Sequence, residues 1–273
     1  MPTLINILIR KNYLRRICGV KHEKFEKITK QLNPAWRALQ KRKQVAGRPY
    51  GVGELREHLL LLLIYYRTYT THLFLAQIFK VDEATICRAI KRISPLAELV
   101  LKIKPEKLLS ENDLQLLIVD ATEQRIERPK NQRAYYSGKK HAHTIKTEIV
   151  TDSKGRILRV SKPYEGRIHD FEIRKTEGPL PAIPILADSG YQGLQNDHSA
   201  GVILPKKKPK NGSLSASEQA RNTKLARCRI AIEHTFAHLK KWHILAARYR
   251  GLFIDYAQIF QTIAGIYNLS FVE

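Results

Sequence analysis

The spacing of hydrophobic and polar positions changes near residue 100 of the chain. From Leu55 to Ile93, apolar residues recur at helical spacing in three consecutive patterns with short breaks between them. After Pro95 come short β-rich runs bounded by Gly, Pro, Asp and Ser, namely LQLLIVDAT, HTIKTEIVTD, RILRVSKPY, PAIPILADSG and SAGVILPK. HDFEIRKTE predicts a helix between the third and fourth runs, and two more helices are predicted from about Ser215 to Lys241 and from Asp255 to Asn268. This order predicts a small all-α domain followed by an α/β or mixed-sheet domain.

The last two of the three helical patterns are spaced as a helix-turn-helix. Apolar residues of THLFLAQIFKVDEATICRAIKRI would let two short helices close across a tight turn, and these are Leu75, Ala76, Phe79, Val81, Ile86 and Ala89. Asp82 can cap the second helix, although Lys80 stands where such a turn often carries Gly. The residues then left facing outward toward DNA are Thr85, Arg88, Lys91 and Arg92. An ordinary helical hairpin with a solvated charged face is the alternative.

The charge balance favours a polyanionic partner. The chain of 273 residues carries 48 Lys and Arg against 25 Asp and Glu, a net charge of +23. Residues 1–50 alone hold 13 Lys and Arg against two Glu, which predicts an electrostatic arm. Within this arm, KFEKITKQLNPAWRALQKRK is expected to be helical up to a break before Pro34, and Ala46 to Gly53 is expected to be a linker. Nucleic acid is the expected partner, and a merely basic or ribosome-associated protein is the alternative.

Several classes of protein are disfavoured by what the chain contains. Its three cysteines are scattered and form no CxxC pair, so neither a disulfide framework nor a structural zinc site is indicated. The longest apolar run, Leu59 to Tyr66, is much shorter than the roughly 20 residues that span a bilayer, and it predicts a buried helix. The first residues lack the charge order of a secretory signal. We therefore expect a cytoplasmic protein without a membrane partner, associated with the nucleoid in a bacterium.

Three carboxylates are candidates for a metal site. Asp120 in LQLLIVDAT and Asp188 in IPILADSGY each end an apolar, strand-like run. Glu233 lies in the predicted helix RCRIAIEHTFAHLKKW. At about 100° per residue, Arg229, Glu233 and Lys240 fall within roughly 40° of one another on that helix. Three carboxylates that converge from two strands and a helix would suit divalent metal and phosphate chemistry.

Each of these residues also has an ordinary structural interpretation. An Asp after a strand is as often a turn former, and Glu233 could be a surface residue paired with a nearby Lys. Arg229 and Lys240 could serve solubility alone. His234 and His238 lie four apart, a spacing that can ligate zinc, but no third nitrogen or sulfur ligand accompanies them. Packing or phosphate contact is therefore the default for this pair.

Two further basic segments are candidates for DNA contact. Lys139 and Lys140, with His141 and His143, crowd the start of the second predicted strand. They could steer DNA, and a solvated hairpin edge with protective charges is equally compatible with them. The tract PKKKPK, Pro205 to Lys210, is interpreted as a mobile, DNA-facing loop, although nuclear-localisation motifs have a similar composition.

In this order and spacing, these residues resemble the DDE transposases of bacterial insertion sequences, specifically the insertion sequence five group, and are similar to Harbinger-like transposases. The resemblance runs from about Leu55 to the C-terminus. It includes YYSGKKHAHTIKTEIV, GRIHD and the arginine pair of AARYRG, and its centre is Asp120 in VDAT, Asp188 in LADSGY and the run Arg229, Glu233 and Lys240. The family signature often has Tyr three residues before the Arg, where this chain has Ala226.

The resemblance implies an RNase H-like mixed-sheet catalytic domain after the helix-turn-helix domain. The first Asp of the family lies on the first strand, the second at the fourth, and the Glu on a later helix, which here are Asp120, Asp188 and Glu233. His169 and Asp170 also recur in the family, so Asp170 competes for the second position. Asp188 is preferred because it ends the run expected to be the fourth strand. The expected domains are a basic arm and linker (1–50), the helix-turn-helix (51–100) and the catalytic domain (112–273).

The activity that the resemblance implies is transposition. Two Mg²⁺ ions held by the three carboxylates, with Mn²⁺ able to substitute, would serve cleavage at the element ends and transfer of the 3′-OH ends to target DNA. Arg229 and Lys240 would hold the DNA backbone near the scissile phosphate. The partner is double-stranded DNA, on which a homo-oligomer is expected. The alternatives are an RNase H-fold endonuclease that does not join strands and a domesticated, catalytically idle DNA-binding protein.

Overall fold

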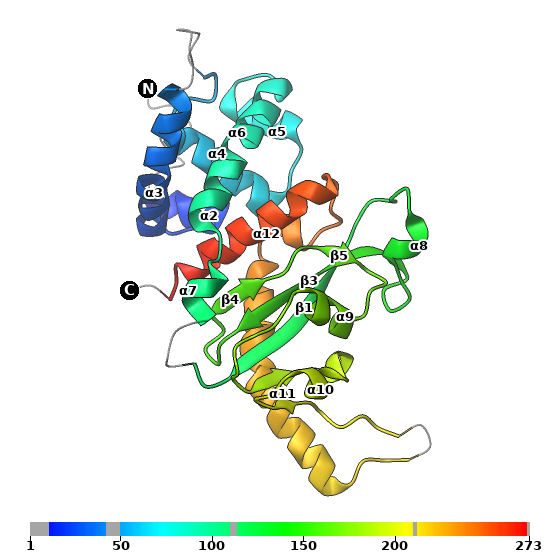
Figure 1. Ribbon diagram of the computed structural model, residues 1–273. Helices are drawn as coiled ribbons and strands as arrows, with labels where there is room; N and C mark the ends of the chain where they lie inside the picture. The colour runs from blue at the N-terminus through cyan, green and yellow to red at the C-terminus, as the bar shows by residue number, and fades with distance from the viewer. Residues whose placement is uncertain (1–10, 42–49, 110–113, 210–211, 272–273) are drawn as a thin grey trace. The chain divides into compact units, whose positions relative to one another are not determined.

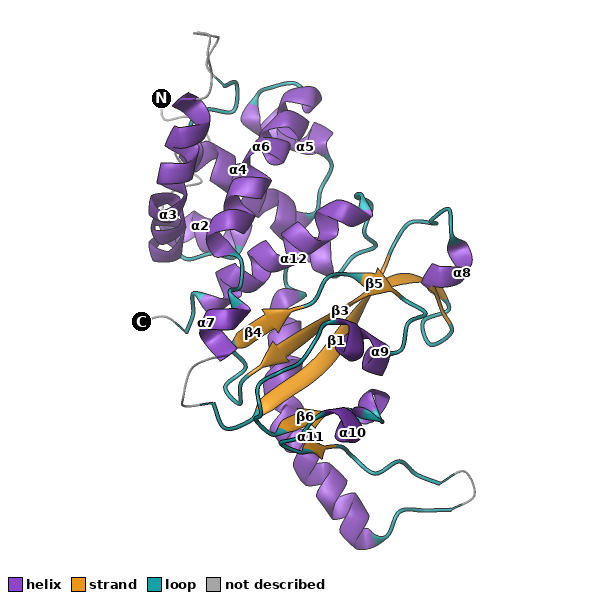
Figure 2. Cartoon of the chain, in the orientation of Figure 1, coloured by secondary structure: helices purple, strands orange, loops and turns teal. Residues whose placement is uncertain are grey.

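The computed structural model describes residues 11–41, 50–109, 114–209 and 212–271 (Figures 1 and 2). Within these ranges, no helix is long and apolar enough to cross a membrane. The chain divides into two compact units. The N-terminal unit comprises residues 1–102, 240–247 and 258–269, and the sheet unit comprises residues 103–239, 248–257 and 270–273.

This division differs from the boundaries expected from sequence, which placed all of 112–273 in one domain. The segments 240–247 and 258–269 belong with the N-terminal helices. Burial is the physical reason, because Trp242, Ile244 and Ile263 are at most 6% exposed. Of the predicted basic arm and its linker, residues 1–10 and 42–49 lie outside the described residues, as does Lys210 of the PKKKPK tract.

The described part of the N-terminal unit is helical. Its core helix is α4 (Leu55–Thr68), in which every residue from Leu59 to Ile64 is buried, as expected of a helix that is apolar on all sides. Around α4 pack α2 (Lys11–Cys18), α3 (His22–Lys41), α6 (Glu83–Leu101) and the short 3₁₀ turn η2 (His243–Leu245). The predicted buried helix at Leu59–Tyr66 is confirmed.

The predicted break before Pro34 is wrong, because α3 continues through this residue to Lys41. A proline inside a helix loses one backbone hydrogen bond and crowds the preceding turn. Buried residues flank Pro34 on both sides, Leu32 before it and Trp36 after it. Packing of this face therefore keeps the two halves of the helix together.

Helices α5 (His72–Phe79) and α6 form the predicted helix-turn-helix. Lys80, which stands where Gly is common, has a φ of 54°, so the turn does use the left-handed conformation that glycine adopts most easily. Asp82 caps α6, because its side chain accepts a hydrogen bond from the Thr85 amide at 2.7 Å. The apolar residues predicted to close the pair are buried, except for the half-buried Val81.

The sheet unit contains a mixed seven-stranded sheet in the order β2-β3-β1-β6-β7, with β4 and β5 also paired to β3. Each of the five predicted runs contains one of the strands β1, β3, β4, β6 and β7, and the third run also includes Tyr164, the first residue of β5. Strands β1 (Leu117–Arg125), β3 (Ala142–Thr151) and β4 (Ile157–Val160) are antiparallel neighbours, and β6 (Ile185–Ala187) and β7 (Val202–Ile203) lie parallel to β1. The α/β, RNase H-like class is therefore confirmed, and β2 (Tyr136–Ser137) and β5 (Tyr164–Glu165) are short additions.

Helices accompany this sheet, and α11 (Ala216–Leu239) contacts both β1 and β6 (Figure 2). The predicted helix in HDFEIRKTE is α9 (Asp170–Thr176). Other elements are α7 (Pro105–Leu109), α8 (Gln132–Tyr135), α10 (Leu194–Asp197) and α12 (Phe253–Asn268), the last of which contributes residues to both units. The core beside β1 and β6 includes Val119, Val150, Leu158 and Tyr191, all at most 1% exposed.

Candidate active site

Two aspartates lie at neighbouring positions on parallel strands. Val119 of β1 pairs with Ala187 of β6, and the next residue along each chain is Asp120 and Asp188 respectively. Asp120 does not end its strand, contrary to the expectation, because β1 continues to Arg125 through pairing with β3. The pairing of β1 with β6 does stop there, so both carboxylates stand where these two strands separate.

Asp120 is held by α11. Arg229 Nη2 donates to Asp120 Oδ2 at 2.8 Å, and both side chains are 18% exposed. The Ala121 amide donates to Asp120 Oδ1 at 2.8 Å. Burial raises the pKa of Asp120, the Arg229 charge opposes the shift, and the nearby Asp188 charge adds to it, so that the pKa is about 6. A buried carboxylate facing a second carboxylate is a position at which a bound cation would be favoured.

Asp188 forms the turn that follows β6. Its Oδ1 accepts a hydrogen bond from the Gly190 amide at 2.6 Å and so caps the 3₁₀ turn η1 (Ser189–Tyr191). A Cβ at Gly190 would lie 2.9 Å from Asp188 Oδ1 and 3.0 Å from Asp170 Oδ2. A larger residue at this position would displace one or both carboxylates, because both approach the Gly190 backbone.

Asp170, the competitor for the second ligand position, already has a cation as partner. Lys146 Nζ lies 3.0 Å from Asp170 Oδ1 and donates to the Ile168 carbonyl at 2.8 Å. Asp170 is the first residue of α9, and the exposed His169 stands at the cap position without a side-chain capping bond. Asp170 and Asp188 thus lie near one another but differ in partner, because Asp188 accepts from an amide and Asp170 from an ammonium group.

The third predicted carboxylate, Glu233, lies one helical turn after Arg229 on α11 and is exposed. Across the described residues, no group of three or more His, Cys, Asp or Glu side chains is arranged to hold a metal ion. The predicted helix to Lys241 is too long, because α11 ends at Leu239 and Lys240 begins the segment that belongs to the N-terminal unit. His234 and His238 are exposed on α11.

A buried charged network adjoins the aspartates, and sequence reasoning missed it. Glu148 of β3 and Arg174 of α9 form an ion pair with side chains 1% and 3% exposed. Burial raises the pKa of Glu148 to about 7, although Arg174 opposes the shift. Tyr191 is fully buried, and charges on Glu148, Asp120, Asp170 and Asp188 add to the effect of burial in raising its pKa. The sequence signal was a Lys and a Glu within the apolar run HTIKTEIVTD.

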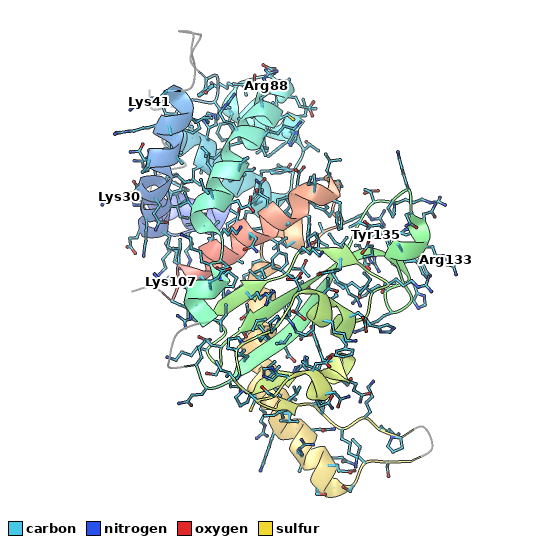
Figure 3. The ribbon with its side chains drawn as sticks, viewed as in Figure 1. Lys30, Lys41, Arg88, Lys107, Arg133 and Tyr135 are labelled. Carbon is cyan, nitrogen blue, oxygen red and sulfur yellow. The ribbon has the colours of Figure 1, made fainter. Side chains whose placement is uncertain are left out.

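The residues predicted to read DNA occupy two different environments on α6. Arg88 is exposed (Figure 3), and its side chain donates to Thr85 Oγ1 at 2.9 Å. Lys91 is also exposed. Arg92 is half-buried: its guanidinium lies 3.9 Å from the centre of the Tyr50 ring and its Nη1 lies 3.1 Å from His58 Nε2. His58 is fully buried, and burial lowers its pKa to about 4. Arg92 is thus packed within the unit in this structure.

The basic segments of the sheet unit also separate into exposed and bound residues. Lys139 and Lys140 are exposed in the turn between β2 and β3. In the PKKKPK tract, Lys206 forms an ion pair with Glu218 of α11, and its amide donates to Asn222 Oδ1 at 2.9 Å. Lys207 and Lys208 are exposed. The described part of the tract is therefore attached to α11 at its second residue.

Comparison with known proteins identifies the family of the chain. The family profile "DDE superfamily endonuclease" matches residues 119–268, and "Helix-turn-helix of DDE superfamily endonuclease" matches residues 54–103. The chain is 32% identical to the "Probable transposase for insertion sequence element IS702" of Microchaete diplosiphon over 262 residues, which cover 93% of this chain and 92% of the relative. A relative from Streptomyces albus G, with the corresponding name for insertion sequence element IS112, is 26% identical over 230 residues, which cover 82% and 83% of the two chains. The chain belongs to the DDE superfamily of endonucleases.

Proposed function

We propose that this protein is a transposase that binds the ends of its own mobile element, cleaves phosphodiesters there and transfers the 3′-OH ends to target DNA. The observation that carries the proposal is the placement of Asp120 and Asp188 where two parallel strands separate, with Arg229 against Asp120. Relatives named as insertion-sequence transposases share more than four-fifths of the chain's length with it, which supports transposition over cleavage alone.

The donor set fits a hard divalent cation. DDE superfamily members generally use divalent metals, and carboxylate oxygens are the ligands that Mg²⁺ and Mn²⁺ prefer. Asp120 and Asp188 supply such oxygens, and burial beside a like charge favours a cation near Asp120. We propose Glu233 as the third ligand, because it follows Arg229 by one turn on the helix that contacts β1 and β6. When bound, two Mg²⁺ would activate the attacking hydroxyl and stabilise the leaving oxygen.

The protein's own residues would position the DNA around this site. Arg229 of α11 forms an ion pair with Asp120. We propose that Arg229 binds a phosphate oxygen of the scissile strand through its planar guanidinium, and that Lys240 acts as a point charge on DNA. Asp188 keeps its position through the Gly190 amide, so the second ligand is fixed by the turn after β6.

Recognition of the element ends is assigned to α6. The exposed Arg88 and Lys91, together with Thr85, would contact DNA, and Lys139 and Lys140 would bind phosphates nearer the cleavage site. Arg92 would contribute only after release from Tyr50. Two element ends must be paired for transposition, so we expect a homodimer or a larger assembly on DNA.

The proposal is tested by cleavage and joining assays on duplexes that carry the DNA flanking the coding region. Asp120→Asn, Asp188→Asn and Glu233→Gln should each reduce nicking by roughly 1,000-fold or more. Binding to the ends should persist, because these residues lie outside α6. Cleavage without joining would identify an endonuclease instead. If Asp188→Asn nicks normally and Asp170→Asn is inactive, the second ligand is misassigned.

A further inference from the structure

A hollow of about 430 Å³ lies at the far end of the sheet from β6. It is lined by Gln132 and Arg133 of α8, Tyr136 of β2, His143 of β3 and Arg167, which follows β5. Figure 3 shows Arg133 on α8, the helix that also carries Tyr135. The hollow is open to solvent at the surface and is not an enclosed cavity. None of the residues proposed as metal ligands lines it.

The walls of this hollow are fixed by backbone pairing. Tyr136 pairs with His143 across β2 and β3, and their ring centres lie 6.0 Å apart in an edge-to-face arrangement. The Arg167 amide donates to the Ala134 carbonyl at 3.2 Å, which ties this arginine to α8. A Cβ at the preceding Gly166 would lie 1.9 Å from Thr144 Oγ1, so only glycine permits this approach to β3.

The chemistry of the lining suits a nucleotide. Two guanidinium groups are available for one phosphate, and the Tyr136 ring, in a residue 46% exposed, offers a face for a base. His143 and Gln132 add groups that can hydrogen-bond to a base edge. The five residues that line the hollow include no carboxylate to repel a phosphate.

An apolar ridge stands beside the hollow. Leu252 and Ile254 are 70% and 79% exposed, and Phe253 between them packs its ring against Tyr135, 5.8 Å between centres. Proteins that unstack DNA insert apolar side chains of this kind between base pairs. These exposed apolar residues and the cationic, aromatic hollow belong to the same unit.

We propose that the hollow holds one nucleotide that has left the DNA base stack, with its base on Tyr136 and its phosphate between Arg133 and Arg167. The proposal rests on the proposed function, because it takes DNA as the substrate. His143 lies six residues along β3 from Ile149, the partner of Asp120, which is roughly 20 Å at the rise of a strand. The unstacked nucleotide would lie about six base pairs from the scissile phosphate, at 3.4 Å per base pair.

The experiment measures binding of the full-length protein to element-end duplexes without divalent cations, by fluorescence anisotropy. Each duplex carries one mismatch, moved along the DNA in successive probes. A mismatched base is easier to extrude, so a mismatch at the extruded position should tighten binding. Base stacking on an aromatic ring corresponds to about fivefold to 150-fold in affinity, and Tyr136→Ala should lose this advantage.

Controls separate the hollow from general electrostatics and from folding. Tyr136→Phe keeps the ring and should keep the mismatch preference. Arg133→Ala should weaken the mismatch preference. Arg128→Ala removes an exposed arginine outside the lining and should leave the preference unchanged. On the wild-type protein, permanganate should modify one thymine near the proposed position, which tests unstacking without any variant.

Two outcomes would overturn the proposal. In the first, no mismatch position tightens binding and permanganate modifies no thymine. In the second, a folded Tyr136→Ala protein still binds the mismatched duplex more tightly than the matched one. Either result would leave a cationic surface that binds only intact duplex. A protein that cleaves element ends but lacks the preference contradicts the hollow alone. A protein that shows the preference but never cleaves contradicts the proposed transposition alone.

Discussion

On α6 the side chain of Arg88 is 63% exposed and that of Lys91 is also exposed, whereas Asp120 and Arg229 beside β1 and β6 are each only 18% exposed. Exposed cations act additively and are screened by salt. Enclosed charges depend on one specific partner, because a buried charge that loses its partner keeps its full desolvation cost. The two regions should therefore respond to substitution in different ways.

The largest expected effect is on stability and comes from the buried pair. Arg174→Ala should lower the free energy of unfolding by about 3 to 5 kcal/mol, because it leaves the Glu148 carboxylate buried without its cation. Arg88→Ala removes the same kind of side chain from the surface of α6 and should change stability by less than about 0.5 kcal/mol. Urea unfolding followed by circular dichroism measures both. Equal losses would remove the distinction between the two regions.

The next effect is a pH dependence at Asp120. Burial raises the folded-state pKa of Asp120 to about 6, above the unfolded value of about 3.9. The Asp120 side chain therefore contributes its full stabilisation below the unfolded pKa, and this stabilisation is lost as the pH rises through 6. When the pH rises from 4 to 7 in metal-free buffer, the free energy of unfolding should fall in both proteins. The fall should be smaller in Asp120→Asn than in wild type, by about 2 to 3 kcal/mol. Glu148 titrates in the same direction in both proteins, so the difference isolates Asp120. Parallel pH profiles would contradict the buried environment.

A smaller effect separates two neighbours on α6. Arg92→Ala should lower stability by about 1 kcal/mol, because it removes the guanidinium from the Tyr50 ring. Lys91→Ala is the matched control on an exposed side chain and should leave the thermal midpoint unchanged. Thermal unfolding of the two variants compares them directly. A midpoint lowered equally in both would mean that the Tyr50 contact adds nothing to stability.

The smallest effect appears only in binding. Lys91→Ala should reduce the slope of log affinity against log salt by about 0.9, the contribution of one neutralised phosphate. Asp120→Asn, measured alongside, should leave the slope unchanged. Titration of the full-length protein with element-end DNA at several salt concentrations gives both slopes. An unchanged slope for Lys91→Ala would place this residue away from the DNA.

Sequence patterns located the strands because burial and strand propensity agree along each apolar run. They did not show that β1 continues to Arg125, because DATEQR is polar and is held in the sheet by pairing with β3. Pro34 indicated a break, yet the buried Leu32 and Trp36 outweigh the lost backbone bond. In each case a tertiary contact overrides a local preference.

The candidate site was partly predictable for the same reason. Asp120 and Asp188 follow apolar runs, so strand pairing alone brings them together. The ion pair of Glu148 with Arg174 could not be found this way, since 26 residues separate the partners and only the position of α9 joins them. The end of α11 at Leu239 was missed as well, because the next residues include the buried Trp242 of another compact unit.

Residues 240–247 and 258–269 complete the N-terminal unit, so this unit cannot finish folding until the end of the chain has been synthesised. A Cβ at Gly265 would lie 1.8 Å from the Leu101 carbonyl oxygen, so α12 packs closely on the end of α6. A ribosome makes about 5 to 20 residues per second, and the first 102 residues emerge long before residue 265 is joined to the chain. During that interval the recognition helices lack part of their core. A nascent or prematurely ended chain would therefore carry an incompletely packed helix-turn-helix until the sheet unit has been synthesised.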